Sequence, residues 1–129
     1  MRLPMAHCLR WSVVGIYPAC NLSNMYAGGT GPFYQDIQSD YDFSSPDGHT
    51  ATTAGYDLML LPASDFATSP ILMWASHSDT SVMRSQNEDP FAPRVNAAGG
   101  NATIIPSSGN HGDASNFNPQ AVVAFLEAH

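Results

Sequence analysis

Two side chains that could act in proton transfer follow short apolar segments in the second half of the chain. Asp79 comes after the run Ile71–Ala75, and His111 comes after the run Ala102–Ile105. An imidazole suits the role of general base because its ordinary pKa lies near neutrality. A carboxylate bonded to the other ring nitrogen can orient the imidazole and stabilise its charged form. The pair could therefore take a proton from a nucleophile and return it to a leaving group.

Both residues depend on strands to position them. The two apolar runs and a third, Trp11–Tyr17, are short and do not alternate with polar residues. Such runs are typical of buried strands in a parallel sheet whose faces are covered by helices. We therefore predict an α/β fold with about three parallel strands and covering helices. Because the carboxyl ends of such strands meet at one edge of the sheet, Asp79 and His111 should meet if their strands are neighbours.

Helices are expected between and after the last two strands. The segment 83–98 contains two prolines, which predict a helix that begins near them rather than running through them. The pair Gly99-Gly100 should end that helix. Asn118 can cap a last helix in which Pro119 takes the first position, where its missing N–H is not needed.

The composition limits the possible functions. The chain has 129 residues, enough for one small domain, with 43% hydrophobic and 12% charged residues, which is typical of a globular protein. Eleven acidic residues against four arginines and no lysine give a net charge of −7, so a nucleic-acid surface is not expected. No apolar run approaches the roughly 20 residues that span a membrane. We identify no signal peptide, and the sequence leaves the localisation open.

The segment 21–69 has no regular pattern and contains many glycines, prolines and aromatic residues. A structureless segment of this length predicts a cap- or lid-like insertion. Its aromatic residues between positions 26 and 43 either pack beneath a loop or line a pocket. A helical turn or two is expected over 51–61, before Pro62. Residues 1–10 have no clear period and stay unassigned.

Four aspartates in this insertion invite comparison with a calcium-binding loop; they are Asp36, Asp40, Asp42 and Asp47. Asp40 and Asp42 match the first two ligand positions of such a loop. Ser45, however, stands where the loop requires glycine, and no glutamate closes it. We therefore interpret the group as a solvated acidic loop.

The motifs around Asp79 and His111 occur in an order that resembles the C-terminal part of the α/β-hydrolase family. In that family the triad runs serine, acid, histidine, each on a turn after a strand. The pattern strand, G-x-x-D, helix, strand, G-x-H-G, helix fits Ser76-His-Ser-Asp79 and Gly109-Asn-His111-Gly112. The segments 13–22 and 54–58 resemble the strand after the nucleophile region and the stretch leading to the acid-bearing strand. The resemblance covers roughly residues 11–129, of which 70–129 carry the acid and the base.

This resemblance implies a serine hydrolase that acts on ester or related acyl bonds of a small-molecule substrate through an acyl-enzyme. His111 would be general base and then general acid, Asp79 would orient it, and no cofactor would be required. Two features depart from the family pattern. Ser76 replaces the usual glycine, and no G-x-S-x-G nucleophile motif occurs in the 129 residues. We therefore expect an incomplete, C-terminal portion of a hydrolase domain that is inactive alone.

A missing neighbouring strand would leave the strand 11–17 with an open edge, which favours poor solubility or association with another chain. The alternative function is a non-catalytic binding module derived from a hydrolase, with its aromatic loop as the interaction surface.

Other histidines and acids compete for the same roles. Asp113 lies two residues after His111 and is interpreted as a loop or helix-entry residue. His77 is expected to be an exposed turn residue, with substrate contact as the alternative, and His49 and His129 carry no signal. A metal hydrolase built on His111 and Asp113 lacks an H-x-H or H-E-x-x-H cluster.

The two cysteines, Cys8 and Cys20, are interpreted as small buried side chains, and a single bridge between them is the alternative. His7 next to Cys8 could suggest a nucleophile with its base, but adjacent side chains point apart on most backbones. Trp74, within a predicted strand, is assigned to the core.

Overall fold

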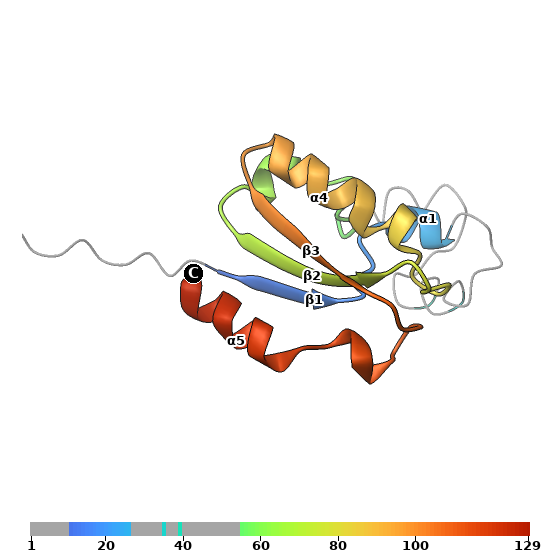
Figure 1. Ribbon diagram of the computed structural model, residues 1–129. Helices are drawn as coiled ribbons and strands as arrows, with labels where there is room; N and C mark the ends of the chain where they lie inside the picture. The colour runs from blue at the N-terminus through green and yellow to red at the C-terminus, as the bar shows by residue number, and fades with distance from the viewer. Residues whose placement is uncertain (1–10, 27–34, 36–38, 40–54) are drawn as a thin grey trace, which may run out of the picture.

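The computed structural model describes residues 11–26, 35, 39 and 55–129. In the described residues, three strands form one sheet, with helices between and after them (Figure 1). The elements in chain order are β1 (Val13–Ile16), α1 (Leu22–Tyr26), the 3-10 helix η1 (Ala63–Phe66), β2 (Pro70–Ser76), the 3-10 helix η2 (Arg84–Gln86), α4 (Glu88–Ala97), β3 (Asn101–Ser107), the 3-10 helix η3 (Ala114–Asn116) and α5 (Pro119–Ala128).

All three strands are parallel, and their order in the sheet is β1-β2-β3. Val13 pairs with Ile71 in β2, and Ile71 pairs with Ala102 in β3, so the three strands are in register along their length. This sheet confirms the predicted α/β class and its three parallel strands. Because the strands point the same way, the segments that follow them lie at one end of the sheet (Figure 1).

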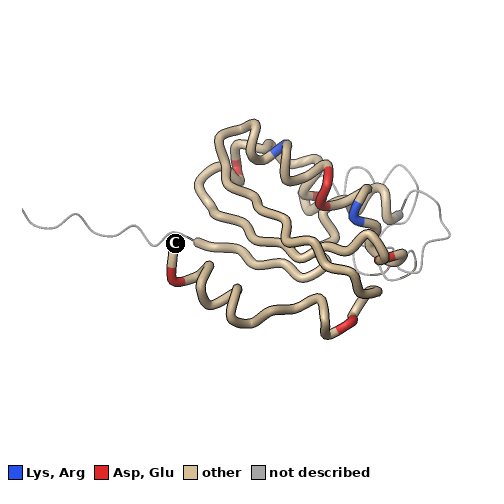
Figure 2. Tube along the Cα trace, in the orientation of Figure 1, with Lys and Arg blue, Asp and Glu red and all other residues tan. Residues whose placement is uncertain are grey.

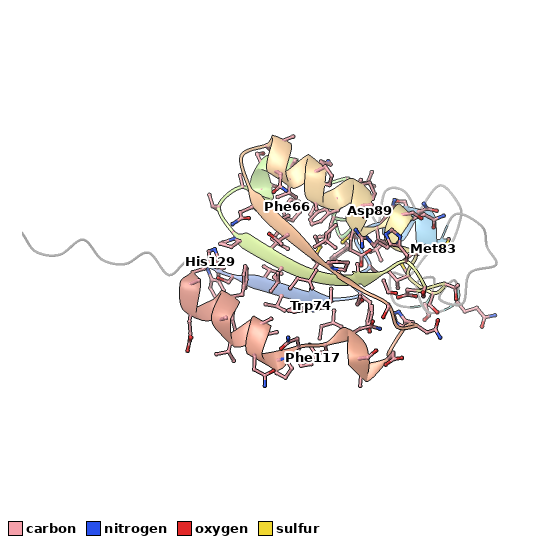
Figure 3. The ribbon with its side chains drawn as sticks, in the orientation of Figure 1. Phe66, Trp74, Met83, Asp89, Phe117 and His129 are labelled. Atoms are coloured by element: carbon pink, nitrogen blue, oxygen red, sulfur yellow. The ribbon has the colours of Figure 1, made fainter. Side chains whose placement is uncertain are left out.

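Helices α4 and α5 lie on opposite faces of the sheet (Figure 1). The core lies between the sheet and α4; its members are Cys20, Ile71, Met73, Phe91, Ala92, Val95 and Ala102. On the other face, Trp74 packs edge-on against Phe117, with 6.1 Å between ring centroids (Figure 3). Trp74 is buried, as predicted for a core residue.

The central strand β2 is buried along its whole length because it has a strand on each side and a helix over each face. This explains why its sequence is a continuous apolar run rather than an alternating one. The outer strand β1 is different, since the side chains of Val13 and Ile16 are 48% and 43% exposed. Trp11, just before β1, is 79% exposed.

The helix between β2 and β3 begins near its prolines, as predicted, but the expectation that it does not run through them is wrong. α4 starts at Glu88 and runs through Pro90 and Pro93. Pro90 lies in the first turn, where backbone N–H groups have no partner within the helix, but Pro93 lies inside it and removes one helical hydrogen bond. The helix ends as expected, because the N–H groups of Gly99 and Gly100 bond to carbonyls of its last turn.

The helical turn expected over 51–61 is wrong for residues 55–61, which form turns. Asp57 accounts for the difference: its carboxylate accepts the N–H of Met59 at 2.9 Å and the N–H of Ser23 at 2.8 Å. Such a bond between an aspartate and a backbone N–H two residues later competes with helix formation. The rest of the proposed cap, at 27–34, 36–38 and 40–54, lies outside the described residues.

The last helix forms as its sequence predicts. The Asn118 side chain accepts the N–H groups of Gln120 and Ala121, and Pro119 occupies the first helical position. The apolar stripe of α5 faces the sheet only in part, since Val122 and Phe125 are half-buried while Val123 is exposed. α5 therefore covers its face of the sheet more loosely than α4 covers the other.

Candidate active site

Three loops that follow the three strands converge at the carboxyl end of the sheet. Asp79 lies just beyond β2 and His111 beyond β3, and His111 Nδ1 is 2.8 Å from Asp79 Oδ2. The Asp79 side chain is 1% exposed and the His111 side chain 37%. Tyr17, the residue after β1, completes the group, because its ring lies against the imidazole. The contact between acid and base that the sequence predicts is therefore present.

The turn after β2 fixes Asp79 through hydrogen bonds to its own backbone. Asp79 Oδ1 accepts the N–H groups of Ser81 at 2.8 Å and Val82 at 2.9 Å. Ser76 accepts the N–H of Ser78 through its hydroxyl and closes the turn. Asp79 is thus both a turn aspartate and a partner of His111, with one carboxylate oxygen used for each purpose.

These contacts determine the protonation of the pair. Burial raises the pKa of Asp79, but the hydrogen bonds from His111, Val82 and Ser81 outweigh it and leave the pKa below its ordinary value of 3.8. Asp79 is therefore ionised at neutral pH, and an ionised carboxylate can only accept hydrogen bonds. Nδ1 of His111 must then carry the proton and donate it to Asp79. In the neutral imidazole this leaves Nε2 as the basic nitrogen.

The loop that carries His111 is held by Asn116, a residue that the sequence analysis did not identify. The Asn116 side chain accepts the N–H of Gly109 at 2.8 Å and donates to the carbonyl of Asn110 at 3.0 Å, and it is 1% exposed. A Cβ at Gly109 would lie 2.5 Å from Asn116, and Gly112 has φ +76°. Both glycines of the G-x-H-G motif are therefore required by the geometry of this loop.

Tyr17 was expected only as the end of a strand. Its backbone has φ 51°, a left-handed conformation that costs a residue with a Cβ roughly 1–3 kcal/mol. Its N–H donates to the carbonyl of Trp74 at 3.0 Å, and its hydroxyl donates to the carbonyl of Asp113 at 2.9 Å. Its ring centroid is 5.1 Å from that of His111. The only signal in the sequence is its place directly after an apolar run and before proline.

The competing residues lie elsewhere. The Asp113 carboxylate accepts the N–H of Ser115 and caps η3, as expected for a helix-entry residue, and this bonding lowers its pKa. His77 is exposed, as predicted for a turn residue. His129 is exposed at the end of the chain and contacts the carbonyl of Phe125. None of these three lies between Asp79 and His111.

A second polar group lies beneath the site, where α4 begins. Glu88 is 1% exposed, and burial raises its pKa to about 7, with a further rise from Asp79. Within the described residues its Oε2 has no hydrogen-bond partner. Cys20 is a fully buried free thiol, and burial together with Glu88 and Asp57 raises its pKa to about 12. Cys20 is therefore an inert core residue, as interpreted from the sequence, and not half of a bridge.

Several predicted features fall on residues that are not described. The acidic group Asp36, Asp40, Asp42 and Asp47 lies outside the described residues, as do His7, Cys8, His49 and the aromatic side chains between 26 and 43. Within the described part of the chain, no three histidine, cysteine or acidic side chains are arranged to hold a metal ion. No described helix is long and apolar enough to cross a membrane.

Comparison of the chain with models of known protein families, with curated proteins and with solved structures finds no match.

Proposed function

We propose that this chain supplies the acid and the base of a serine hydrolase that acts on ester or related acyl bonds. The observation that carries the proposal is the 2.8 Å contact between His111 Nδ1 and a buried, ionised Asp79 at the carboxyl end of a parallel sheet. A carboxylate bonded to Nδ1 gives the imidazole the tautomer that a general base needs. The sequence motifs around both residues support the same family.

In this mechanism Nε2 of His111 takes the proton from a serine hydroxyl as the oxygen attacks the acyl carbon. Asp79 does not take up a proton; it stabilises the imidazolium and keeps the ring oriented. The same imidazolium then protonates the leaving alcohol, which leaves an acyl-enzyme. A water molecule then attacks the acyl-enzyme through the same proton transfers, and the carboxylic acid product is released. Replacing such an orienting aspartate lowers kcat about 10⁴-fold when the nucleophile is present.

The serine itself is proposed to come from outside these 129 residues, since they contain no G-x-S-x-G motif. The chain alone should then be inactive towards esters. Incubation of the purified chain with a fluorophosphonate, followed by peptide mass spectrometry, should label no serine. A covalently labelled serine would overturn this part of the proposal. A G-x-S-x-G motif encoded upstream, in frame or frameshifted, would support it.

The acid and base roles have a direct test that needs no nucleophile. Asp79→Asn should abolish the low-field Nδ1–H proton resonance of His111 and shift the ring to the Nε2–H tautomer, because the amide can donate to Nδ1. Imidazole nitrogen NMR of the folded chain measures both. Asp113→Asn is the matched control, because the Asp113 carboxylate bonds to Ser115 and not to His111. A resonance that survives Asp79→Asn, or that Asp113→Asn abolishes, would refute the pair.

Within the described residues β1 has a strand neighbour on one side only, and this edge favours a second candidate function, an interaction module that pairs with another chain. The other outer strand, β3, is protected against such pairing. Pro106 has no backbone N–H to donate, and the Asn96 side chain bonds both the N–H and the carbonyl of Ala102. In the part of the chain that the structure describes, β1 contains no proline and has no such side-chain bond at its outer edge, and its Val13 and Ile16 are exposed. Concentration-dependent association in sedimentation velocity would support this candidate, and a monodisperse monomer that unfolds cooperatively would contradict it.

A further inference from the structure

Tyr17 connects all three strand ends at the site. Its backbone N–H bonds to the carbonyl of Trp74 in β2, which fixes the start of the side chain to the central strand. Its hydroxyl, at the far end of the side chain, donates to the carbonyl of Asp113 at 2.9 Å, two residues beyond His111. Between these two anchors, its ring lies against the imidazole, with 5.1 Å between centroids and 45° between the planes.

The backbone of Tyr17 shows that this placement is imposed by its surroundings. Among the described residues Tyr17 alone has a positive φ without being glycine. It also precedes Pro18, and a residue before proline favours extended conformations. A strained conformation of this kind persists only where neighbouring contacts hold it, and such positions cluster at functional sites. Here those contacts are the hydrogen bonds to Trp74 and Asp113.

We propose that Tyr17 is a positioning residue that holds the imidazole of His111 in hydrogen-bond contact with Asp79. Its ring restricts rotation of the imidazole, and its hydroxyl ties down the loop on the far side of His111. This inference rests on the acid and base roles of the proposed function. It extends them by adding a residue at the end of β1 to the proposed pair of Asp79 and His111, although Tyr17 itself exchanges no proton. Asp79 orients the ring through Nδ1, and Tyr17 limits the directions in which the ring can leave.

Two variants separate the ring from the hydroxyl. Tyr17→Phe keeps the ring contact and removes the bond to Asp113; solvent exchange of the His111 Nδ1–H should rise roughly fivefold, the factor for one ordinary hydrogen bond, with the tautomer unchanged. Tyr17→Gly removes both contacts but relieves the backbone, because glycine adopts a positive φ readily. It should give a mixture of tautomers and lose the Nδ1–H resonance.

The stability of the fold is measured on the same samples by urea unfolding, because a merely structural residue would change the unfolding free energy and leave the His111 signals alone. Phe117→Leu is the matched control, since Phe117 packs against Trp74 and not against His111. Its Nδ1–H resonance and tautomer should match those of the unmodified chain.

The outcomes distinguish this inference from the proposed function. If the unmodified chain shows an Nδ1–H resonance that depends on Asp79, and both Tyr17 variants keep its exchange rate and tautomer, the role of Tyr17 is overturned while the pair stands. If the unmodified chain shows no such resonance, the pair fails and the role of Tyr17 fails with it. Faster exchange in Tyr17→Phe and mixed tautomers in Tyr17→Gly, with Phe117→Leu unchanged, support the inference.

Discussion

At the scale of single residues, the carboxyl group of Asp79 serves the fold and the site together. One oxygen accepts two backbone N–H groups and shapes the turn after β2, while the other accepts a hydrogen bond from Nδ1–H of His111. Because the hydrogen bonds from His111, Val82 and Ser81 together keep the pKa of the carboxyl below its ordinary value despite its burial, the turn contributes to the tautomer of the imidazole. A substitution at Asp79 therefore changes both local stability and the histidine.

Asn116 should matter to the same histidine without touching it. Asn116→Ala leaves the N–H of Gly109 and the carbonyl of Asn110 without their partner. We expect a loss of about 2 kcal/mol in the free energy of unfolding, measured in urea, and broadening of the His111 signals. Asn118→Ala, at the cap of α5, should cost about 1 kcal/mol and leave those signals unchanged. Equal effects of both variants on the His111 signals would argue that the Asn116 hydrogen bonds do not hold the loop of His111.

The raised pKa of Glu88 should make the stability of the fold depend on pH between 4.5 and about 7. Its pKa is raised from 4.5 to about 7 in the fold, so between these values the folded chain binds more protons than the unfolded chain. The free energy of unfolding should therefore be highest below pH 4.5 with respect to this group and fall by roughly 3 kcal/mol as the pH rises through 7. Asp79 acts at lower pH, since its depressed pKa gives stability that is lost as the pH falls below 3.8.

Urea unfolding at a series of pH values tests this, with Glu88→Gln as the decisive variant. The amide cannot ionise, so the slope between pH 4.5 and 7 should flatten. Glu127→Gln, an exposed position on α5, should keep the slope of the unmodified chain. A slope that persists in Glu88→Gln would show that other groups produce it.

At the scale of elements, each side chain of the proposed site lies just beyond the end of a strand, and the parallel arrangement brings these ends together. The helix α4, which connects β2 to β3, contains Pro93 and therefore lacks one helical hydrogen bond. The helix tolerates this residue since Phe91, Ala92 and Val95 pack its other face against the sheet.

Pro93→Ala should therefore stabilise the fold. Pro93 is exposed, and alanine restores a helical N–H and removes a steric conflict with the preceding turn. The gain is about 3 kcal/mol in helix propensity less about 1 kcal/mol for the more flexible unfolded chain, so we expect an increase of roughly 2 kcal/mol in the free energy of unfolding. Thermal and urea unfolding measure it. Asn96→Ala, near the end of the same helix, should instead destabilise, because Asn96 bonds Ala102 in β3.

At the scale of the whole molecule, the two outer strands present different edges. The described strands carry no charged residue, and charges lie on α4, α5 and the connecting segments (Figure 2). Among the described residues, no charged side chain lies on β1, which exposes apolar side chains at the outer edge of the described sheet.

We expect the chain to self-associate along β1. Ile16→Lys places a charge at this edge and should shift the sedimentation profile to monomer. Val123→Lys is the matched control, because Val123 is also exposed, 53%, but lies on α5. If both variants abolish association equally, general hydrophobic attraction rather than edge pairing is responsible.

Much of the fold followed from local patterns. Each strand was visible as a short apolar run, and the last helix as an asparagine cap followed by proline, because these signals depend on neighbours in the chain. The continuation of α4 through Pro93 was not visible, since proline opposes a helix locally and packing against the sheet sustains it. The turn at Asp57 was missed for a similar reason: one of its partners, Ser23, lies far away in the sequence.

The sequence by itself determined the α/β class and placed an acid and an imidazole after successive strands. The tertiary structure decided which strands are neighbours, and so brought His111 Nδ1 within 2.8 Å of Asp79. It also decided that Asn116 and Tyr17 hold the histidine loop. Local propensity is encoded within a few residues, whereas these contacts join segments that are distant in the chain and exist only once the sheet has formed.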